Sequence, residues 1–235
     1  MEVTAIAKTI FQENKDVLTT WFSVLTRGPK SFHAAHLDRN STLLYGLRFM
    51  FYMIVIELVL TIPFAKGMES KSENVFVIGG ALAEDLVEYL AAALILHGAM
   101  KAFGGKGRAQ GCVASYCFFT AYVPIIAIFM LPWNRLSTPL MAKSANYPQI
   151  VAQLSGTLSQ LATWDRYTLV LSFLAATVVW ILFYTGVFRC FRALHKLSRT
   201  RAVFAFVVGL LLTAAFNAVF TIPLLTGLYQ TSAGN

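Results

Sequence analysis

Charged residues are scarce in this sequence of 235 residues, where Asp, Glu, Lys and Arg together make up 13%. Soluble domains usually hold about 25%, so the shortage excludes a disordered chain, a nucleic-acid-binding module and almost any water-soluble fold. Hydrophobic residues make up 57% of the chain. They are grouped into long runs, whereas a half-buried strand or a surface helix would spread them at period two or 3.6. The sequence therefore predicts an all-α, polytopic membrane protein.

Catalytic signatures are also missing. The sequence contains no nucleophile elbow, no Ser-His-Asp order, no HExxH pair and no dinucleotide-binding fingerprint. We therefore expect the protein not to be an enzyme and to bind no cofactor.

Five stretches hold the roughly 20 apolar residues that a helix needs to cross a bilayer. They lie at 42–64, 78–100, 112–132, 167–188 and 202–223. These stretches predict a bundle of five transmembrane helices and divide the chain into three parts. A cytoplasmic amphipathic segment occupies 1–41, the membrane domain occupies 42–225, and an extracytoplasmic tail occupies 226–235.

The N-terminal segment has apolar residues at mostly helical spacing between positions 3 and 25, up to a break at Gly28-Pro29. This pattern predicts a helix that lies in the cytoplasmic interface, with Trp21 at the depth of the headgroups. Basic residues give the orientation. Thirteen Lys and Arg fall in 1–41, 101–111 and 189–201, which share one side of a five-helix topology, against five on the other side. This asymmetry predicts a cytoplasmic N-terminus and an extracytoplasmic C-terminus.

Cysteine is rare. Cys112, Cys117 and Cys190 all fall near the predicted cytoplasmic ends of helices, where a reducing compartment predicts free thiols. His33 and His36 have a spacing that two metal ligands can use on a helix. However, Cys112 and Cys117 lack the two-residue spacing of a zinc knuckle, and nothing fixes four ligands together. We therefore expect no metal site.

Ionisable residues inside the predicted spans are the main functional candidates, because each costs about 2.5–3.5 kcal/mol at the centre of a membrane helix. Glu57 lies in the outer half of the first span, and Glu84, Asp85 and Glu88 lie in the outer half of the second. Facing carboxylates cannot all stay ionised in a low dielectric, so this group fits a proton or cation site. A structural role, with Glu84 and Asp85 at the outer interface and Glu57 protonated or hydrogen-bonded, is nevertheless the favoured interpretation, and a transport or gating role is the alternative. His97, also in the second span, stands on the opposite side of its helix from Glu88.

A glycine-rich loop follows the second span. Gly104, Gly105, Lys106 and Gly107 invite a phosphate-loop interpretation, but the loop lacks the GKS/T ending and the preceding strand that such a site requires. With Arg108 beside it, the loop is better interpreted as a turn that contacts anionic lipid headgroups or a partner.

Several short motifs resemble the signature of the Yip1 domain. The run His97–Gly107 (HGAMKAFGGKG) resembles the histidine and glycine-pair loop that ends the second membrane helix of that family. The run Val24–Phe32 (VLTRGPKSF) resembles its pre-membrane segment, and Tyr116 and Pro124 are candidates for a Tyr and a Pro of the next helix. The resemblance covers about residues 20–225 and implies five membrane helices with the N-terminus inside.

The eukaryotic branch of that family is associated with Rab GTPases and carries an Asp-Leu-Tyr-Gly-Pro motif. Only the last two residues of this motif are present in this sequence, as Gly28-Pro29. The short N-terminal segment looks more like the bacterial branch, which implies a bacterial cytoplasmic (inner) membrane.

We therefore expect a non-enzymatic membrane scaffold or accessory subunit of a membrane complex. The alternatives are a small transporter or channel that uses Glu57, Glu84 and Glu88, and, less favoured, a GTPase-linked trafficking adaptor. The expected partners are the lipid bilayer and other membrane proteins. Binding of a second copy of the chain is an open alternative. We expect no binding to nucleic acid.

Overall fold

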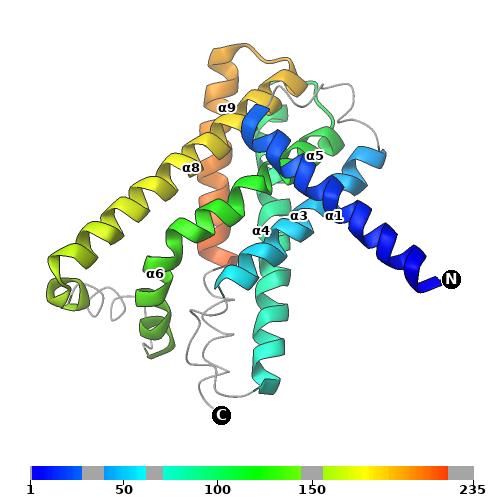
Figure 1. The fold of residues 1–235 in the computed structure, drawn as a ribbon. Helices are drawn as coiled ribbons and strands as arrows, with labels where there is room; N and C mark the ends of the chain where they lie inside the picture. Colours follow the sequence, from blue (N-terminus) through cyan, green and yellow to red (C-terminus); the bar gives the residue numbers. More distant parts are fainter. Residues whose placement is uncertain (1, 28–39, 62–70, 144–155, 222–235) are drawn as a thin grey trace.

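The structure, a computed structural model, describes residues 2–27, 40–61, 71–143 and 156–221, and this part of the chain contains helices and turns but no strand. Figure 1 shows the arrangement of the helices. In chain order they are α1 (Glu2–Arg27), α3 (Asn40–Thr61), α4 (Lys71–Ala102), α5 (Ala109–Phe119), the 3-10 turn η3 (Thr120–Tyr122), α6 (Val123–Lys143), α8 (Thr163–His195), α9 (Arg199–Phe216) and the π-helical turn η4 (Asn217–Thr221).

Four stretches of the described chain are long and apolar enough to cross a membrane: Thr42–Thr61, Ala109–Leu136, Thr163–His195 and Arg199–Phe220. Helix α4 is not among them, because three carboxylates interrupt its apolar sequence. The prediction of an all-helical fold with several helices able to span a membrane is confirmed for the described part of the chain. The count of five spans stays a prediction, since it depends on α4.

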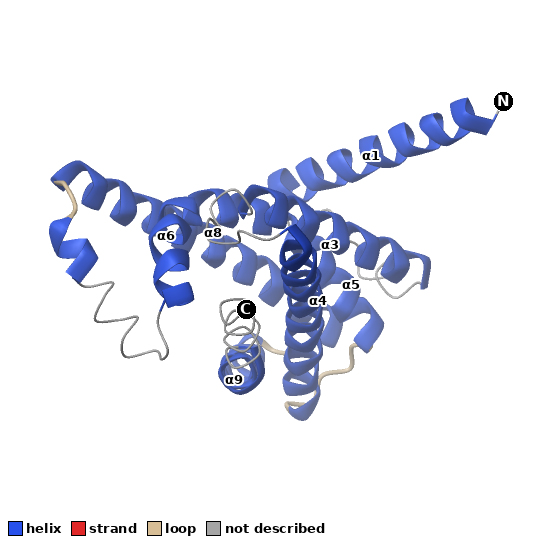
Figure 2. Cartoon of the chain, turned by 90° about the horizontal axis from the view of Figure 1, so that it is seen from below, coloured by secondary structure: helices blue, strands red, loops and turns tan. Residues whose placement is uncertain are grey.

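Apolar side chains cover the outside of the bundle, as lipid contact requires. The large exposed hydrophobic residues of α8 and α9 include Val170, Leu171, Leu174, Val178, Ile181, Phe204, Val207, Leu211 and Leu212. Helices α4 and α9 pack side by side, with α9 seen end-on in Figure 2, whereas the N-terminal part of α1 extends away from the bundle.

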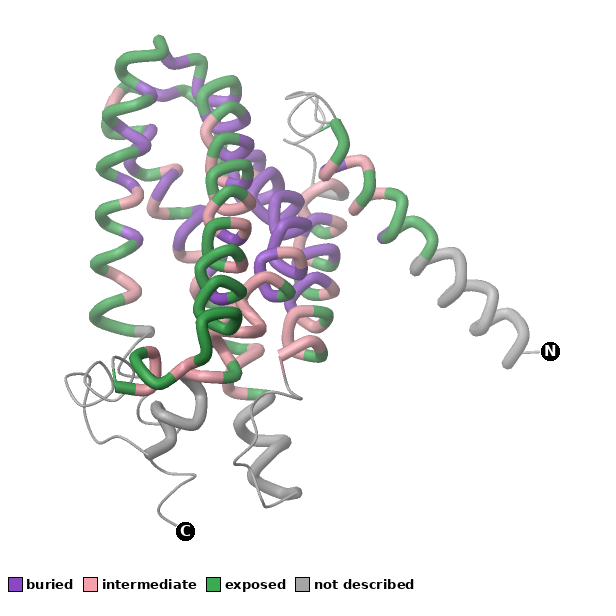
Figure 3. The backbone as a smooth tube through the Cα atoms, turned by 60° about the vertical axis from the view of Figure 1, so that its left-hand side comes forward, coloured by how far each residue is buried: buried purple, intermediate pink, exposed green. Residues whose placement is uncertain are grey.

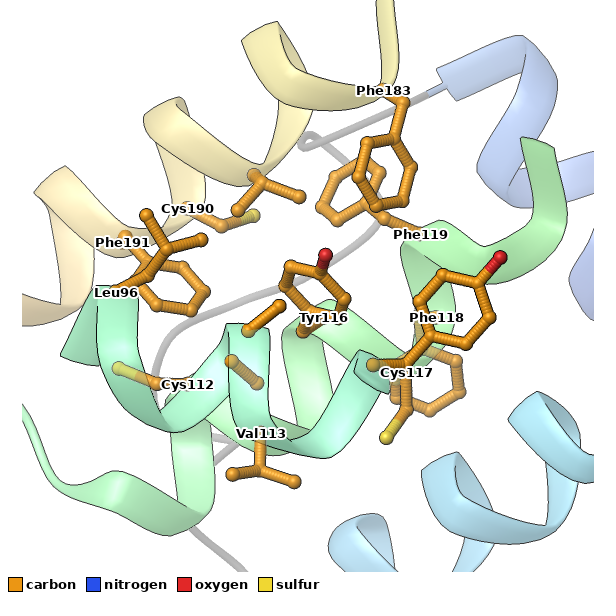
Figure 4. Close-up of a cluster of buried hydrophobic side chains, with 14 of the residues drawn as sticks. Leu96, Cys112, Val113, Tyr116, Cys117, Phe118, Phe119, Phe183, Cys190 and Phe191 are labelled. Atoms are coloured by element: carbon orange, nitrogen blue, oxygen red, sulfur yellow. The ribbon is translucent and has the colours of Figure 1, made fainter. Parts of the chain in front are cut away.

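Helix α5 is the centre of the bundle. In an 18-residue apolar window of the span Ala109–Leu136, about 83% of the residues are buried, against 22–28% in the corresponding windows of the other three spans. Figure 3 shows the buried residues gathered at this position, and Figure 4 shows the apolar and aromatic side chains packed around it. The rings of Tyr116 and Phe183 meet edge to face, with centroids 5.4 Å apart. Helices α3, α4 and α8 therefore pack around α5 and form the core with it.

Small residues allow these helices to approach closely. A Cβ at Gly186 on α8 would overlap the ring of Phe119, and one at Gly209 on α9 would lie 2.7 Å from the Leu96 side chain of α4. Close helix crossings at small residues are the usual packing solution in membranes, where apolar burial gives helices little reason to associate.

The central span is interrupted at η3, and Pro124 explains why. Proline has no N–H to donate to the carbonyl of Thr120, which instead accepts a bond from Val123 and closes a 3-10 turn. The span predicted at 112–132 is thus two helices, α5 and α6.

Helix α1 covers the residues for which the sequence predicts a helix. Its C-terminal half packs on protein: Val17 and Val24 are buried, and the hydroxyls of Thr20 and Tyr45 lie 2.8 Å apart. The position of α1 in the cytoplasmic interface stays a prediction.

Candidate functional site

Four carboxylates of α3 and α4 lie on sides of these helices that the bundle partly or fully covers. Glu84 is buried, with 8% of its surface exposed, and Glu57, Asp85 and Glu88 are partly buried. The charges of Asp85 and Glu88 both act on Glu57, which places the three groups in one electrostatic cluster across the α3–α4 contact. We call Glu57, Glu84, Asp85 and Glu88 the acidic cluster.

A polar residue from the last described turn completes the acidic cluster. The amide nitrogen of Asn217, the first residue of η4, donates a 2.6 Å hydrogen bond to Oε1 of Glu88. Asn217 was not predicted as a site residue because it is uncharged and stands inside an apolar run. A lone amide in such a run is nevertheless a signal, since a polar group in a membrane needs a partner.

Two oxygen atoms of this group have no hydrogen-bond partner although water cannot reach them. They are Oε2 of Glu57 and Oδ1 of Asn217. An inaccessible acceptor without a donor is costly. A bound proton or cation would supply the missing partner, so the acidic cluster with Asn217 has the composition of a cation- or proton-binding site.

His97 has a different surrounding, as the angular separation from Glu88 predicts. Its Nδ1 lies 3.1 Å from Nε2 of His195, the last residue of α8, and the two ring centroids are 5.0 Å apart. Sγ of Cys112, on α5, lies 3.3 Å from the same Nε2 atom. We call His97, Cys112 and His195 the histidine–cysteine cluster.

The glycine loop packs against this cluster. Helix α4 ends in a Schellman motif, in which the N–H of Gly104 bonds to Lys101 and the N–H of Gly105 bonds to Met100, each at 2.9 Å. Gly104 has φ of 89°, a left-handed conformation that favours glycine. The first glycine of the loop is therefore explained by the helix end.

The other two glycines of the loop are explained by His195. A Cβ at Gly105 would overlap the His195 ring, and one at Gly107 would lie 3.0 Å from it. The same motif closes α8, where Lys196 takes the left-handed position with φ of 53°. This leaves the carbonyl of His195 to accept a 3.1 Å bond from the N–H of Lys106. The loops after α4 and α8 thus meet at one end of the bundle.

The remaining predicted site residues have simpler positions. Lys106 and Arg108 are exposed at this end, which leaves them accessible to headgroups or a partner, and that role stays a prediction. All three cysteines are buried and free of disulfides. His33, His36, the motif residues Gly28–Phe32 and the tail at 226–235 lie outside the described residues.

The chain matches no protein-family model, no curated protein and no solved structure. The Yip1 resemblance therefore rests on the sequence motifs. Of the residues that carry it, Tyr116 packs in the core and Pro124 follows the 3-10 turn. The acidic cluster and the histidine–cysteine cluster are therefore the structural basis for any functional proposal.

Proposed function

We propose that the protein is a small membrane transporter or channel in which the acidic cluster binds a proton or a cation. The observation that carries this proposal is that two inaccessible oxygen atoms have no hydrogen-bond partner, one on Glu57 and one on Asn217, the residue that donates to Glu88. Carboxylates held against one another inside a bundle are expensive unless they share a positive charge. A cation that enters and leaves this position would be the coupling or transported species.

The location of the acidic cluster supports the same function. It extends over the contact of α4 with α3 and the contact of α4 with η4, so three separate chain segments contribute to it. The π-helical turn that presents Asn217 is a rare geometry that is found frequently at functional sites. Movement of any one of the three segments would change how many groups face the bound cation.

Flux measurements test the proposal. The purified protein is placed in liposomes that contain a pH-sensitive dye or a Na⁺-sensitive dye, and a K⁺ gradient with valinomycin sets an inside-negative potential. We expect proton or Na⁺ uptake by the parent and its loss in Glu57→Gln and in Glu88→Gln, because Gln keeps the size of Glu but removes its charge. Asp165→Asn is the matched control, since it removes an exposed carboxylate from the first turn of α8.

A binding measurement complements the flux. A cation that binds only the folded protein at 100 times its dissociation constant stabilises it by about 2.7 kcal/mol. The melting temperature in detergent should therefore rise with Na⁺ concentration, or with another bound cation, in the parent and in Asp165→Asn but not in Glu57→Gln. Equal flux and equal melting curves in the parent and in the double variant Glu57→Gln/Glu88→Gln would contradict the proposal.

The scaffold function and the GTPase-linked adaptor remain the competing predictions. The scaffold and adaptor functions both rest on the Yip1 resemblance, and the geometry of the acidic cluster supports neither of them. We further propose, on the basic-residue asymmetry and that resemblance, a bacterial cytoplasmic membrane with the meeting loops of α4 and α8 on the cytoplasmic side. Co-purification in mild detergent followed by mass spectrometry would detect a stable partner, which the scaffold function requires.

A further inference from the structure

Three potential metal ligands converge in the histidine–cysteine cluster, and each comes from a different helix. His97 belongs to α4, Cys112 to α5 and His195 to α8. One ligand atom from each residue lies within 4.8 Å of the other two. These positions are separated by 15 and 83 residues in the sequence, so no local spacing could reveal them.

The separations match those of ligands on one ion. Two nitrogen atoms on a tetrahedral zinc ion at about 2.0–2.1 Å are roughly 3.3 Å apart, and a nitrogen and a sulfur are roughly 3.6 Å apart. The observed distances from Nε2 of His195 are 3.1 Å to Nδ1 of His97 and 3.3 Å to Sγ of Cys112. These two separations are within about 0.3 Å of the values expected for a shared ion, and the ligand atoms of the third pair, His97 and Cys112, lie within 4.8 Å of each other.

A hydrogen-bonded cluster explains the same convergence less completely. Nε2 of a neutral imidazole carries either one proton or one lone pair. It can therefore make one strong hydrogen bond, although two polar atoms face it. A metal ion would bind all three atoms at once, and the ligands, two imidazoles and a thiolate, suit closed-shell ions such as Zn²⁺ and Cu⁺.

The surroundings hold the ligands in place. His195 is completely buried and is confined by Gly105 and Gly107 and by the bond that its carbonyl accepts from Lys106. His97 is only partly buried, which leaves an entry path from the surface. Orientation of ligands by a packed surrounding shell is typical of metal sites.

We propose that His97, Cys112 and His195 bind a closed-shell transition-metal ion, Zn²⁺ or Cu⁺. Three protein ligands leave a fourth tetrahedral position open. The bound ion joins the ends of α4, α5 and α8 and so fixes the two loops that meet there. This site is separate from the acidic cluster, because His97 lies nine positions beyond Glu88, about 13 Å further along α4 and on its opposite side.

Metal analysis tests the proposal. The full chain is purified with an affinity tag that contains neither His nor Cys, and bound Zn and Cu are measured by mass spectrometry of the elements. Competition with a chromophoric chelator, under reducing and oxygen-free conditions for Cu⁺, then gives the affinity. We expect one ion per chain, and an affinity at least about 100-fold lower in Cys112→Ser, because even changes outside the ligand set cost 10–100-fold.

Matched controls are available within the chain. Cys117→Ser and Cys190→Ser each remove a buried free thiol from α5 or α8 and should keep the metal. Co²⁺ provides a second readout in the unaltered protein, where a sulfur-to-cobalt charge-transfer band should appear and should be absent in Cys112→Ser. A parent that binds Zn²⁺ and Cu⁺ no better than Cys112→Ser and gives no such band would overturn the proposal. Equal loss of affinity in Cys117→Ser would also overturn it.

Discussion

The indole N–H of Trp21 donates a hydrogen bond to the carbonyl oxygen of Ala121 across 2.7 Å, although the two residues are 100 positions apart. The bond joins α1 to the 3-10 turn between α5 and α6, at the break in the central span. Irregular backbone at membrane depth is tolerated only where protein or water satisfies it. Trp21 therefore ties the N-terminal helix to the part of the central span whose backbone is least regular.

Replacing Trp21 by Phe should destabilise the protein by about 0.5–1.5 kcal/mol, because an aromatic ring remains but the donor is lost. The melting temperature in detergent measures the effect. Phe22→Leu is the control, since Phe22 is the exposed neighbour on the same helix, at 59% exposure. A melting temperature for Trp21→Phe equal to that of Phe22→Leu would show that the bond contributes nothing to stability.

A methyl group at Gly186 should destabilise the protein by about 1–3 kcal/mol, the usual cost of overpacking a core. The added Cβ would overlap Phe119 on the central helix. Gly98→Ala is the matched control, because its Cβ would meet nothing within 4 Å. The control should be neutral or stabilise α4 by about 0.5–1 kcal/mol, since Ala is the better helix former. Similar melting temperatures for the two variants would contradict the close α5–α8 packing.

Asn217 and Glu88 should show energetic coupling. Asn217→Leu removes the donor of the 2.6 Å bond and should cost about 1.5–3 kcal/mol, as for hydrogen bonds to charged groups. In a Glu88→Leu background, which lacks the acceptor, the same substitution should cost less, with an interaction energy of about 0.5–3 kcal/mol. Additive effects in this double-mutant cycle would mean that the bond is not formed in the folded protein.

Metal affinity should decrease as the pH is lowered. Binding to the histidine–cysteine cluster requires neutral imidazoles and a thiolate, so each bound ion displaces protons. The sign follows from mass action: lower pH adds protons, which compete with the metal. Chelator competition at several pH values between about 6 and 8, below the ordinary Cys pKa of about 8.5, so that the thiol proton has to be displaced, measures the slope. A pH-independent affinity would mean that these side chains are not the ligands.

Orientation in the membrane can be tested with single cysteines in a Cys-free background. We expect a Cys at Ser198, between α8 and α9, to react with an impermeant maleimide only after permeabilisation, because the surrounding loop is rich in Lys and Arg. Cysteines at Ser144 and Ser232 should react in intact cells. Labelling of position 198 from outside would reverse the proposed topology.

Much of the helical framework could be predicted from the sequence, because membrane helices are encoded by local composition. The spans at 42–61, 163–195 and 199–220 follow directly from apolar runs. Helix α4 is also helical, but its carboxylates lower its hydropathy, so composition alone does not decide whether it spans. The break at η3 had a local signal in Pro124.

The two clusters could be predicted only in part, because they depend on which helix faces meet. Glu57 and the α4 carboxylates were recognised from their cost in a membrane, whereas Asn217 was missed because it carries no charge. His97 was recognised as polar, but its partner His195 is 98 positions away. Helix packing, which no single periodicity specifies, brings them together.

The contact between Gly105 and His195 restricts which residues natural variants of this chain can carry at these two positions. A Cβ at position 105 would overlap the imidazole and would also lie 2.6 Å from the backbone carbonyl oxygen of Met100. A smaller residue at position 195 would relieve the first clash but not the second. We therefore expect Gly to be kept at position 105 in any set of homologues, and Gly105→Ala to remain destabilising in a His195→Ala background.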